Sequence, residues 1–488
     1  MDKKIAKNYI YSAVYRVLIV IIPLITTPYV ARVLKPEGNG IYGYTNSLAT
    51  LFTLFAALGF SAYGQREIAY KQDDLYGRSV VFFEICFLRA ITTCIAVTAY
   101  IIFSYAFTEY TVYLLPQCMT VMAVLFDISW YYQGLENFKI TVIRNLFIKI
   151  VSVACIFLFV KKDSDLVLYI VILTASNLIS NILYLFSIKK YIVLVKRKDL
   201  HPLRHVRGAI EFFIPLIAVE IYSHLDRIML GSLIPGTTES GYYEQARKVT
   251  TIIVGLIISI NSVMMSRISN LYAKQEKEQI IAFYKQTFKI VLILLVPICV
   301  GLLVTADNFV VWFFGADYTK VATLLKMASL LIIFMCIGNF SGIQYLQPTG
   351  QQNKMTKAYI SAALLNIALN WVLIPSFASV GAMAASIVAE IVSCGMQTFF
   401  LLRSEYRFNM LEGTWKYFLS AIMMALSIFA FNKAFPLGGV IETCINILIG
   451  LIVYFSLLYV CREENTVAIV KKTFHIKRVN DRHMPDKE

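Results

Sequence analysis

Residues Ile210–Ile234 read IEFFIPLIAVEIYSHLDRIMLGSLI, an apolar run that is long enough to cross a bilayer as one helix. Its second half nevertheless carries Glu220, His224, Asp226 and Arg227. A period of 3.6 residues places Glu220, His224 and Arg227 on one side of this helix, together with Ser223 and with Asp226 just beyond the edge. Because ionisable groups at bilayer depth are costly, we expect this side to face an interior cavity or other charged groups rather than lipid.

The start of this stretch repeats a pattern found near the beginning of the chain. Ile214-Pro215-Leu216-Ile217 has the same sequence as Ile22-Pro23-Leu24-Ile25. Each copy continues through an arginine to a proline and a turn rich in glycine and tyrosine: Arg32, Pro36 and Gly40-Ile41-Tyr42 in the first, Arg227, Pro235 and Gly241-Tyr242-Tyr243 in the second. The sequence therefore predicts two halves that open with the same kind of helix.

The composition decides the class of protein. Only 15% of the 488 residues are charged, 58% are hydrophobic, and the mean hydropathy is +0.67. Since soluble proteins have roughly a quarter of their residues charged, the sequence predicts an all-α polytopic membrane protein. Its nine cysteines form no CxxC or Cys/His cluster, so we expect neither a metal site nor a disulfide framework. The basic, apolar N-terminus lacks a small-residue cleavage site and is interpreted as a retained first helix.

Apolar runs of spanning length predict about fourteen transmembrane helices. We expect them at residues 8–33, 41–64, 79–105, 111–134, 140–160, 165–188, 209–234, 243–266, 285–313, 321–346, 356–375, 379–402, 414–434 and 438–461. Of the alternating connecting segments, one set holds about thirty lysines and arginines and the other about six, which places the basic set and both termini in the cytoplasm. The net charge of +15 thus indicates topology and contact with anionic lipid rather than nucleic-acid binding.

A long basic linker after the sixth helix suggests the domain organisation. An even number of spans returns the chain to the same side, as in parallel repeats related by an axis along the membrane normal, an arrangement suited to alternating access. The predicted divisions are an N-terminal lobe (1–188), a cytoplasmic linker (189–208), a C-terminal lobe (209–403), two further helices (404–461) and a basic cytoplasmic tail (462–488).

The basic residues inside the predicted helices form two groups. One group lies within about two turns of a helix end, where the side chains reach the headgroups: Arg144, Arg247, Lys248, Lys289 and Lys326. The other lies deeper and is predicted to line a cavity: Arg16, Arg89, Lys149 and Arg227. Because the predicted helices contain more bases than acids, the cavity should prefer an anion, and arginine offers forked donors to phosphate oxygens. A cationic drug would be repelled.

Embedded amides and acids complete the candidate site. Asn46, with Thr50 and Thr53, forms a polar stripe that either lines the cavity or bonds between helices, and Asn366 and Asn370 leave the same two interpretations open. The embedded acids are Glu84, Asp127, Glu220, Asp226 and Glu390. Such carboxylates either neutralise a base or couple transport to an ion gradient. We expect a static pair between Asp226 and Arg227, and coupling at Glu220 or Glu390.

Four stretches together resemble bacterial polysaccharide flippases of the Wzx type, which belong to the multidrug/oligosaccharidyl-lipid/polysaccharide exporter superfamily. These are VYRVLIVIIPLITTPYVARVLKPEGNGIYGY (14–44), DISWYYQGLENFKITVIRN (127–145), SHLDRIMLGSLIPGTTESGYYEQARKV (223–249) and QPTGQQNK (347–354). The resemblance implies a MATE-like fold of fourteen helices in two lobes around a central cavity. It also implies transport of an oligosaccharide repeat unit on undecaprenyl pyrophosphate across the bacterial inner membrane, for O-antigen, lipopolysaccharide or capsule synthesis.

The resemblance further implies that cavity arginines hold the pyrophosphate, which fits Arg16, Arg89 and Arg227 here. The expected partners are the lipid-linked oligosaccharide, membrane lipids, and a polymerase and chain-length regulator of the same pathway. No cofactor is expected, and there is no P-loop, HExxH or GxSxG motif to suggest an enzyme. Two alternatives remain open: a MATE-type drug or metabolite antiporter, which would suit an acidic cavity, and a membrane-embedded glycosyltransferase or polymerase, which would need a large external loop.

Overall fold

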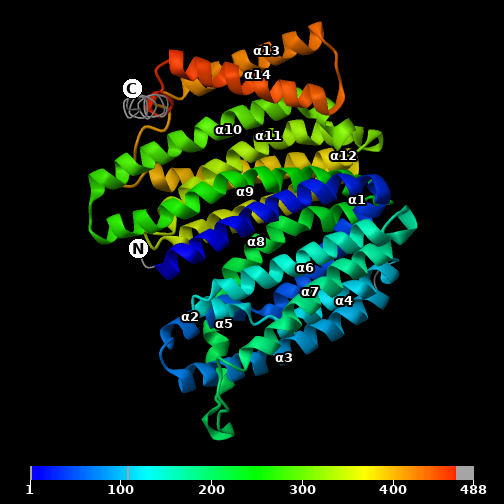
Figure 1. The fold of residues 1–488 in the computed structure, drawn as a ribbon, viewed down its shortest axis with the longest axis vertical. Helices are drawn as coiled ribbons and strands as arrows, with labels where there is room; N and C mark the ends of the chain where they lie inside the picture. Colours follow the sequence, from blue (N-terminus) through cyan, green and yellow to red (C-terminus); the bar gives the residue numbers. More distant parts are fainter. Residues whose placement is uncertain (1–2, 107–108, 469–488) are drawn as a thin grey trace, which may run out of the picture. The chain divides into compact units, whose positions relative to one another are not determined.

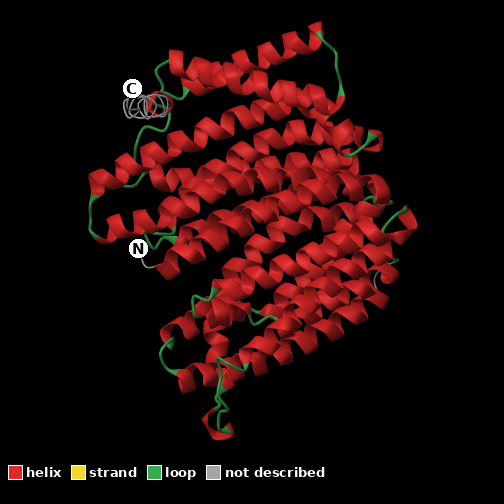
Figure 2. Cartoon of the chain, viewed as in Figure 1, coloured by secondary structure: helices red, strands yellow, loops and turns green. Residues whose placement is uncertain are grey.

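The protein is described here by a computed structural model that covers residues 3–106 and 109–468. Its side chains are described except at 3–21, 138–139, 215, 218, 222, 259–267, 269–270 and 273. All regular elements in the described part are helices (Figure 2). In order they are α1 (Lys3–Ala57), α2 (Phe60–Tyr70), α3 (Leu75–Ala106), α4 (Thr111–Phe126), α5 (Ser129–Gly134), α6 (Phe138–Phe159), α7 (Leu166–Ile188), α8 (Val206–Leu233), α9 (Thr238–Ala273), α10 (Lys277–Phe313), α11 (Thr319–Asn339), α12 (Gln352–Leu402), α13 (Trp415–Ala434) and α14 (Gly439–Val460).

Ten stretches of the described residues are long and apolar enough to cross a membrane, which confirms a polytopic membrane protein. The count of fourteen stays a prediction, because two of these stretches contain an internal break. In α1 the break is at Lys35, whose φ and ψ are 55° and 177°. Pro36 follows it and disfavours the helical conformation for the residue before it. In α12 the break is at Ala378, with φ and ψ of 50° and −128°.

The helices form two compact units, and the division into two lobes stays a prediction. The first contains Met1–Gln245 and Ala363–Ala385, and the second contains Ala246–Ala362 and Ser386–Glu488. In the first, α4 packs against α7 and α1, and α6 packs against α7 (Figure 1). In the second, α10 packs against α11, α13 and α14 around a core that includes Tyr284, Phe288 and Phe340. The predicted boundary at 188 is the end of α7 and the one at 209 lies near the start of α8, whereas the compact units change inside α9 and α12.

Gly40 and Gly241 of the sequence repeat lie inside α1 and α9 rather than in the turns expected there, and the two segments lie against each other in the first unit. A Cβ atom on Gly40 would lie 1.8 Å from the carbonyl oxygen of Thr237, and one on Gly241 would lie 1.9 Å from that of Pro36. The Thr237 hydroxyl also donates to the carbonyl oxygen of Glu37 at 3.0 Å. Only glycine permits so close a backbone approach. This reciprocal contact fixes the second half of α1 against the start of α9.

The linker between α7 and α8 is anchored to α3 by a buried carboxylate. Glu84, fully buried, accepts hydrogen bonds from the backbone N–H of His201 (2.5 Å) and from Nη2 of Arg204 (2.6 Å). Its Oε2 atom also lies 2.7 Å from Nε2 of His205, and His205 Nδ1 lies 2.8 Å from the hydroxyl of Tyr63 on α2. A carboxylate can be buried only when such partners compensate for its lost hydration. Glu84 therefore joins α2, α3 and the linker.

Candidate functional site

The polar face predicted on α8 is present as a row of charged side chains. Nε of Arg227 lies 2.6 Å from Oε2 of Glu244, at the start of α9. Nη1 of Arg227 lies 3.4 Å from Nδ1 of His224, and Nε2 of His224 lies 3.4 Å from Oε2 of Glu220. We call Glu220, His224, Arg227 and Glu244 the α8 row. Its members on α8 are three or four residues apart, as expected for one helical face.

The second half of α1 supplies the other side of this row. The hydroxyl of Ser47 lies 3.4 Å from Nδ1 of His224. A Cβ atom on Gly43 would lie 3.3 Å from the Glu244 carboxylate, so a small residue here lets α9 approach α1 closely. The Arg227 side chain keeps 15% of its surface exposed and that of Glu244 keeps 9%. The ion pair is thus largely desolvated but still accessible, so another anion can compete with Glu244 for the guanidinium.

Asp226 lies beside this row and has different partners. It accepts hydrogen bonds from the hydroxyl of Tyr243 and from Nδ2 of Asn370, the latter at 2.6 Å. Nδ2 of Asn370 also lies 3.0 Å from Oδ1 of Asn366, and both asparagines are fully buried. We call these four residues, Asp226, Tyr243, Asn366 and Asn370, the Asp226 cluster. The sequence favoured a static pair between Asp226 and Arg227. In the structure Arg227 pairs with Glu244, and Asn370 is hydrogen-bonded to Asp226, with Asn366 beside it.

Arg89 is tied into the packing of α3 against α4. Only 2% of its surface is exposed, and Nη1 donates to the carbonyl oxygen of Asp127 at 2.7 Å. Nη2 lies 3.7 Å from Oδ2 of the same residue. Asp127 ends α4, and its Oδ1 accepts the backbone N–H of Ser129 at the start of α5. The Arg89 guanidinium thus packs against the turn between α4 and α5, and the substrate contact expected of it stays a prediction.

The other predicted residues are dispersed. Lys149 is partly buried on α6, and Asn46 is partly buried on α1. The hydroxyls near Asn46 donate within their own helix, from Thr50 to the Asn46 carbonyl at 2.8 Å and from Thr53 to the Ala49 carbonyl at 2.9 Å. These bonds are compatible with both interpretations of that stripe, which stay predictions. Arg16 lies outside the described side chains.

The two predicted coupling acids also differ from each other. The Glu220 side chain is 38% exposed in the α8 row, while Glu390 is 5% exposed in the second unit. A Cβ atom on Gly338 of α11 would lie 3.5 Å from Oε1 of Glu390, which places this carboxylate between α11 and α12. Among the described residues no three His, Cys, Asp or Glu side chains are grouped closely enough to hold a metal ion.

Sequence reasoning missed one acid, Glu244, and the partners of another, Glu84. Glu244 stands one residue inside the predicted helix 243–266, where it resembled an ordinary boundary charge. One feature of the sequence could have identified it. Glu244 comes three residues after Gly241 of the repeat, and residues three apart lie on the same face of a helix. Glu84 was recognised as an embedded acid, but its partners lie 117 to 121 residues further along the chain. No local pattern could identify them.

Comparison with protein families gives one match that covers more than half of the chain. The family described as "Polysaccharide biosynthesis protein" matches residues 5–272, and the family MatE matches residues 213–372. A "Putative O-antigen transporter" of Escherichia coli (strain K12) is 24% identical over 400 residues, which are 81% of this chain and 96% of the relative. A "Probable low-salt glycan biosynthesis flippase Agl15" of Haloferax volcanii is 26% identical over 241 residues, 49% of this chain and 50% of the relative.

Two solved structures share the fold. A structure of "Lipid II flippase MurJ, inward closed conformation" matches with a TM-score of 0.72 and 17% identity, over 93% of this chain and 98% of that one. An "Inward-facing conformation of a multidrug resistance MATE family transporter of the MOP superfamily" matches with a TM-score of 0.58 and 14% identity, over 80% and 98%. At such identities these matches establish a common fold, in agreement with the MATE-like architecture expected from the sequence.

Proposed function

The chain belongs to the polysaccharide biosynthesis protein family, and from this we propose that it carries a lipid-linked oligosaccharide from one membrane leaflet to the other. The family match and the glycan-transporting relatives support this function. As the natural substrate we propose an oligosaccharide repeat unit on undecaprenyl pyrophosphate, moved from the inner to the outer leaflet of a bacterial plasma membrane. The distribution of lysine and arginine supports cytoplasmic termini.

The observation that carries the proposal is the Arg227–Glu244 pair at 2.6 Å on a partly exposed face of α8. A guanidinium presents forked donors that match phosphate as well as carboxylate. When the pyrophosphate arrives, it replaces Glu244 as the partner of Arg227; when it leaves, Glu244 takes its place again. The Arg227 guanidinium therefore has an anionic partner both before and after the pyrophosphate binds, and it is never left desolvated without one.

The MATE-type antiporter is the second candidate, and one observation favours it. The MatE family matches residues 213–372, a range that includes the α8 row and the Asp226 cluster. An antiporter for cationic compounds would bind its substrate through carboxylates such as Glu220 rather than through Arg227. The two functions therefore assign opposite charges to the binding group.

Transport by the purified full chain in vesicles distinguishes the two functions. The vesicles would contain undecaprenyl-pyrophosphate-linked oligosaccharide, and exposure of the sugar on the outer face would be followed with a membrane-impermeant lectin. We expect the wild-type protein to expose the sugar many times faster than protein-free vesicles do. Accumulation of a cationic dye without any movement of the oligosaccharide would instead establish the antiporter.

For coupling to an ion gradient we propose Asp226, with Glu220 and Glu390 as the predicted alternatives. Asp226 is 3% exposed and hydrogen-bonded to Tyr243 and Asn370, so a change in its charge or its ligands would alter how α8 packs against α9 and α12. We expect Asp226→Asn to reduce gradient-driven transport about tenfold, the effect of losing roughly one charge-assisted hydrogen bond. Glu220→Gln and Glu390→Gln test the two alternatives in the same assay. An unchanged response of Asp226→Asn to an imposed proton or sodium gradient would assign this carboxylate a purely structural role.

A further inference from the structure

A groove of about 570 Å³ lies between α6 and α7 within the first unit. It is outside the α8 row and the Asp226 cluster, and its volume is typical of a site for a small ligand. The groove is lined by Asn137, Ile140, Ile143, Arg144, Phe147, Leu183, Ser187 and Tyr191. Its polar and apolar residues are not mixed evenly, and their distribution suggests what it binds.

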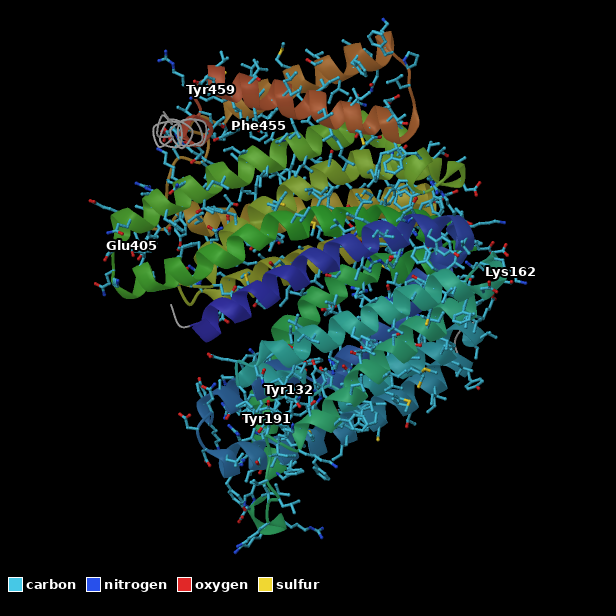
Figure 3. The ribbon with its side chains drawn as sticks, viewed as in Figure 1. Tyr132, Lys162, Tyr191, Glu405, Phe455 and Tyr459 are labelled. Atoms are coloured by element: carbon cyan, nitrogen blue, oxygen red, sulfur yellow. The ribbon has the colours of Figure 1, made fainter. Side chains whose placement is uncertain are left out.

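One end of the groove is polar and held rigidly. Nδ2 of Asn137 donates to the hydroxyl of Tyr191 at 3.1 Å, which joins the start of α6 to the end of α7. Tyr191 packs edge-on against Tyr132, with ring centroids 5.6 Å apart (Figure 3). The guanidinium of Arg144 lies over the ring of Tyr184, 3.0 Å from its centroid, and donates to Oδ1 of its neighbour Asn145 at 2.7 Å. A fixed positive charge therefore faces this end.

The other side of the groove continues into an apolar track along α6. Ile143, Phe147, Ile150 and Leu158 recur at helical spacing and are 48%, 63%, 55% and 66% exposed. Arg144 lies six residues after the first residue of α6, or roughly 9 Å along the axis, which is the depth at which a long basic side chain meets phosphate headgroups. Lys149 is rotated by roughly 140° from Arg144 around the helix, so it does not belong to this face.

We propose that this groove is the loading site for the pyrophosphate and the first prenyl units of the lipid-linked substrate. This inference rests on the proposed function and adds a binding site to it. Arg144 would bind the pyrophosphate, Asn137 and Ser187 would contribute hydrogen bonds, and the hydrocarbon would lie along Ile143 and Phe147. The predicted topology places the start of α6 and the end of α7 on the cytoplasmic side. The proposed substrate would enter the protein from the inner leaflet on this side.

The direct test is photo-cross-linking with the full chain in vesicles of phosphatidylethanolamine and phosphatidylglycerol. The photoreactive residue would be introduced as Ile143→p-benzoylphenylalanine, with Leu168→p-benzoylphenylalanine, an exposed position near the other end of α7, as the control. Undecaprenyl pyrophosphate is the probe. We expect a cross-link to the probe from position 143 and none from position 168. A cross-link to phospholipid alone, or to another protein chain, would overturn the proposal.

Arg144→Gln is expected to weaken this cross-link about tenfold and to raise the substrate concentration needed for half-maximal transport, with little change in the maximal rate. Arg144→Lys should recover part of the affinity, because lysine restores the positive charge but lacks the forked N–H donors of a guanidinium. The control is Lys162→Gln, which removes a charge at the opposite end of α6 (Figure 3). Equal cross-linking by Arg144→Gln and the wild type, with both proteins folded, would refute a phosphate site.

The groove and the transport function can fail separately. If the wild type moves oligosaccharide and Arg144→Gln does so with the same concentration dependence, only the loading site is refuted. If the wild type moves no oligosaccharide at all, the proposed function fails, whatever the cross-linking shows.

Discussion

Replacing Arg227 by alanine is expected to reduce oligosaccharide transport about 100-fold while the protein remains folded in the membrane. Arg227 lies 2.6 Å from Glu244 in a largely desolvated position. Hydrogen bonds to a charged partner contribute roughly 1.5–3 kcal/mol each, so loss of the guanidinium should remove most of the affinity for pyrophosphate. The measurement is the initial rate of sugar exposure in vesicles at equal amounts of inserted protein.

Arg207→Ala is the matched control for Arg227, because it removes the same side chain from the same helix. Its side chain is 93% exposed and lies 3.6 Å from Glu211, so its loss should leave transport near the wild-type rate. Arg227→Lys should retain part of the activity, since it keeps the charge but not the fork.

The double variant Arg227→Ala/Glu244→Ala separates two roles for the arginine. If Arg227 binds the substrate, removing Glu244 as well cannot restore transport. If Arg227 serves only to neutralise Glu244, the double variant should regain activity, because the carboxylate that Arg227 balances is removed as well. Recovery to near the wild-type rate would therefore contradict a substrate role for Arg227.

The second large effect is expected at Glu84. Glu84→Ala should destabilise the protein by about 3 kcal/mol, because it removes the common acceptor of the His201 backbone and the Arg204 and His205 side chains. The Arg204 side chain is 46% exposed, so solvent screens its interaction with Glu84. The expected loss of stability is therefore near the lower end of the range for breaking a buried ion pair. The measurements are thermal unfolding and the protection of residues 189–205 from hydrogen exchange.

Glu84→Ala should also loosen the linker locally, in addition to lowering the stability of the whole protein. We expect amide exchange in the linker to accelerate more than exchange in α3, since α3 keeps its own helical hydrogen bonds. Glu211→Ala is the control, because it removes a 63% exposed carboxylate from the start of α8. Equal linker protection in Glu84→Ala and Glu211→Ala would show that the linker is held by other contacts.

Several features of this fold follow from local sequence. Apolar runs predicted the membrane class and the approximate helix ranges, and the 3.6-residue period placed Glu220, His224 and Arg227 on one face of α8. Pro36 predicted a turn after the first repeat, and the chain does break at Lys35. These features depend on residues within a few turns of one another, and backbone geometry alone relates such neighbours.

The partners of the charged groups were decided only by the tertiary structure. Arg227 pairs with Glu244 rather than Asp226, Arg89 donates to the carbonyl oxygen of Asp127, and Glu84 accepts hydrogen bonds from a linker more than a hundred residues away. A helical period specifies the direction in which a side chain points but not which helix lies opposite. That depends on the packing of whole helices, where contacts such as the Gly40–Thr237 approach bring distant segments together. The sequence by itself thus determined which residues are embedded, and packing determined their partners.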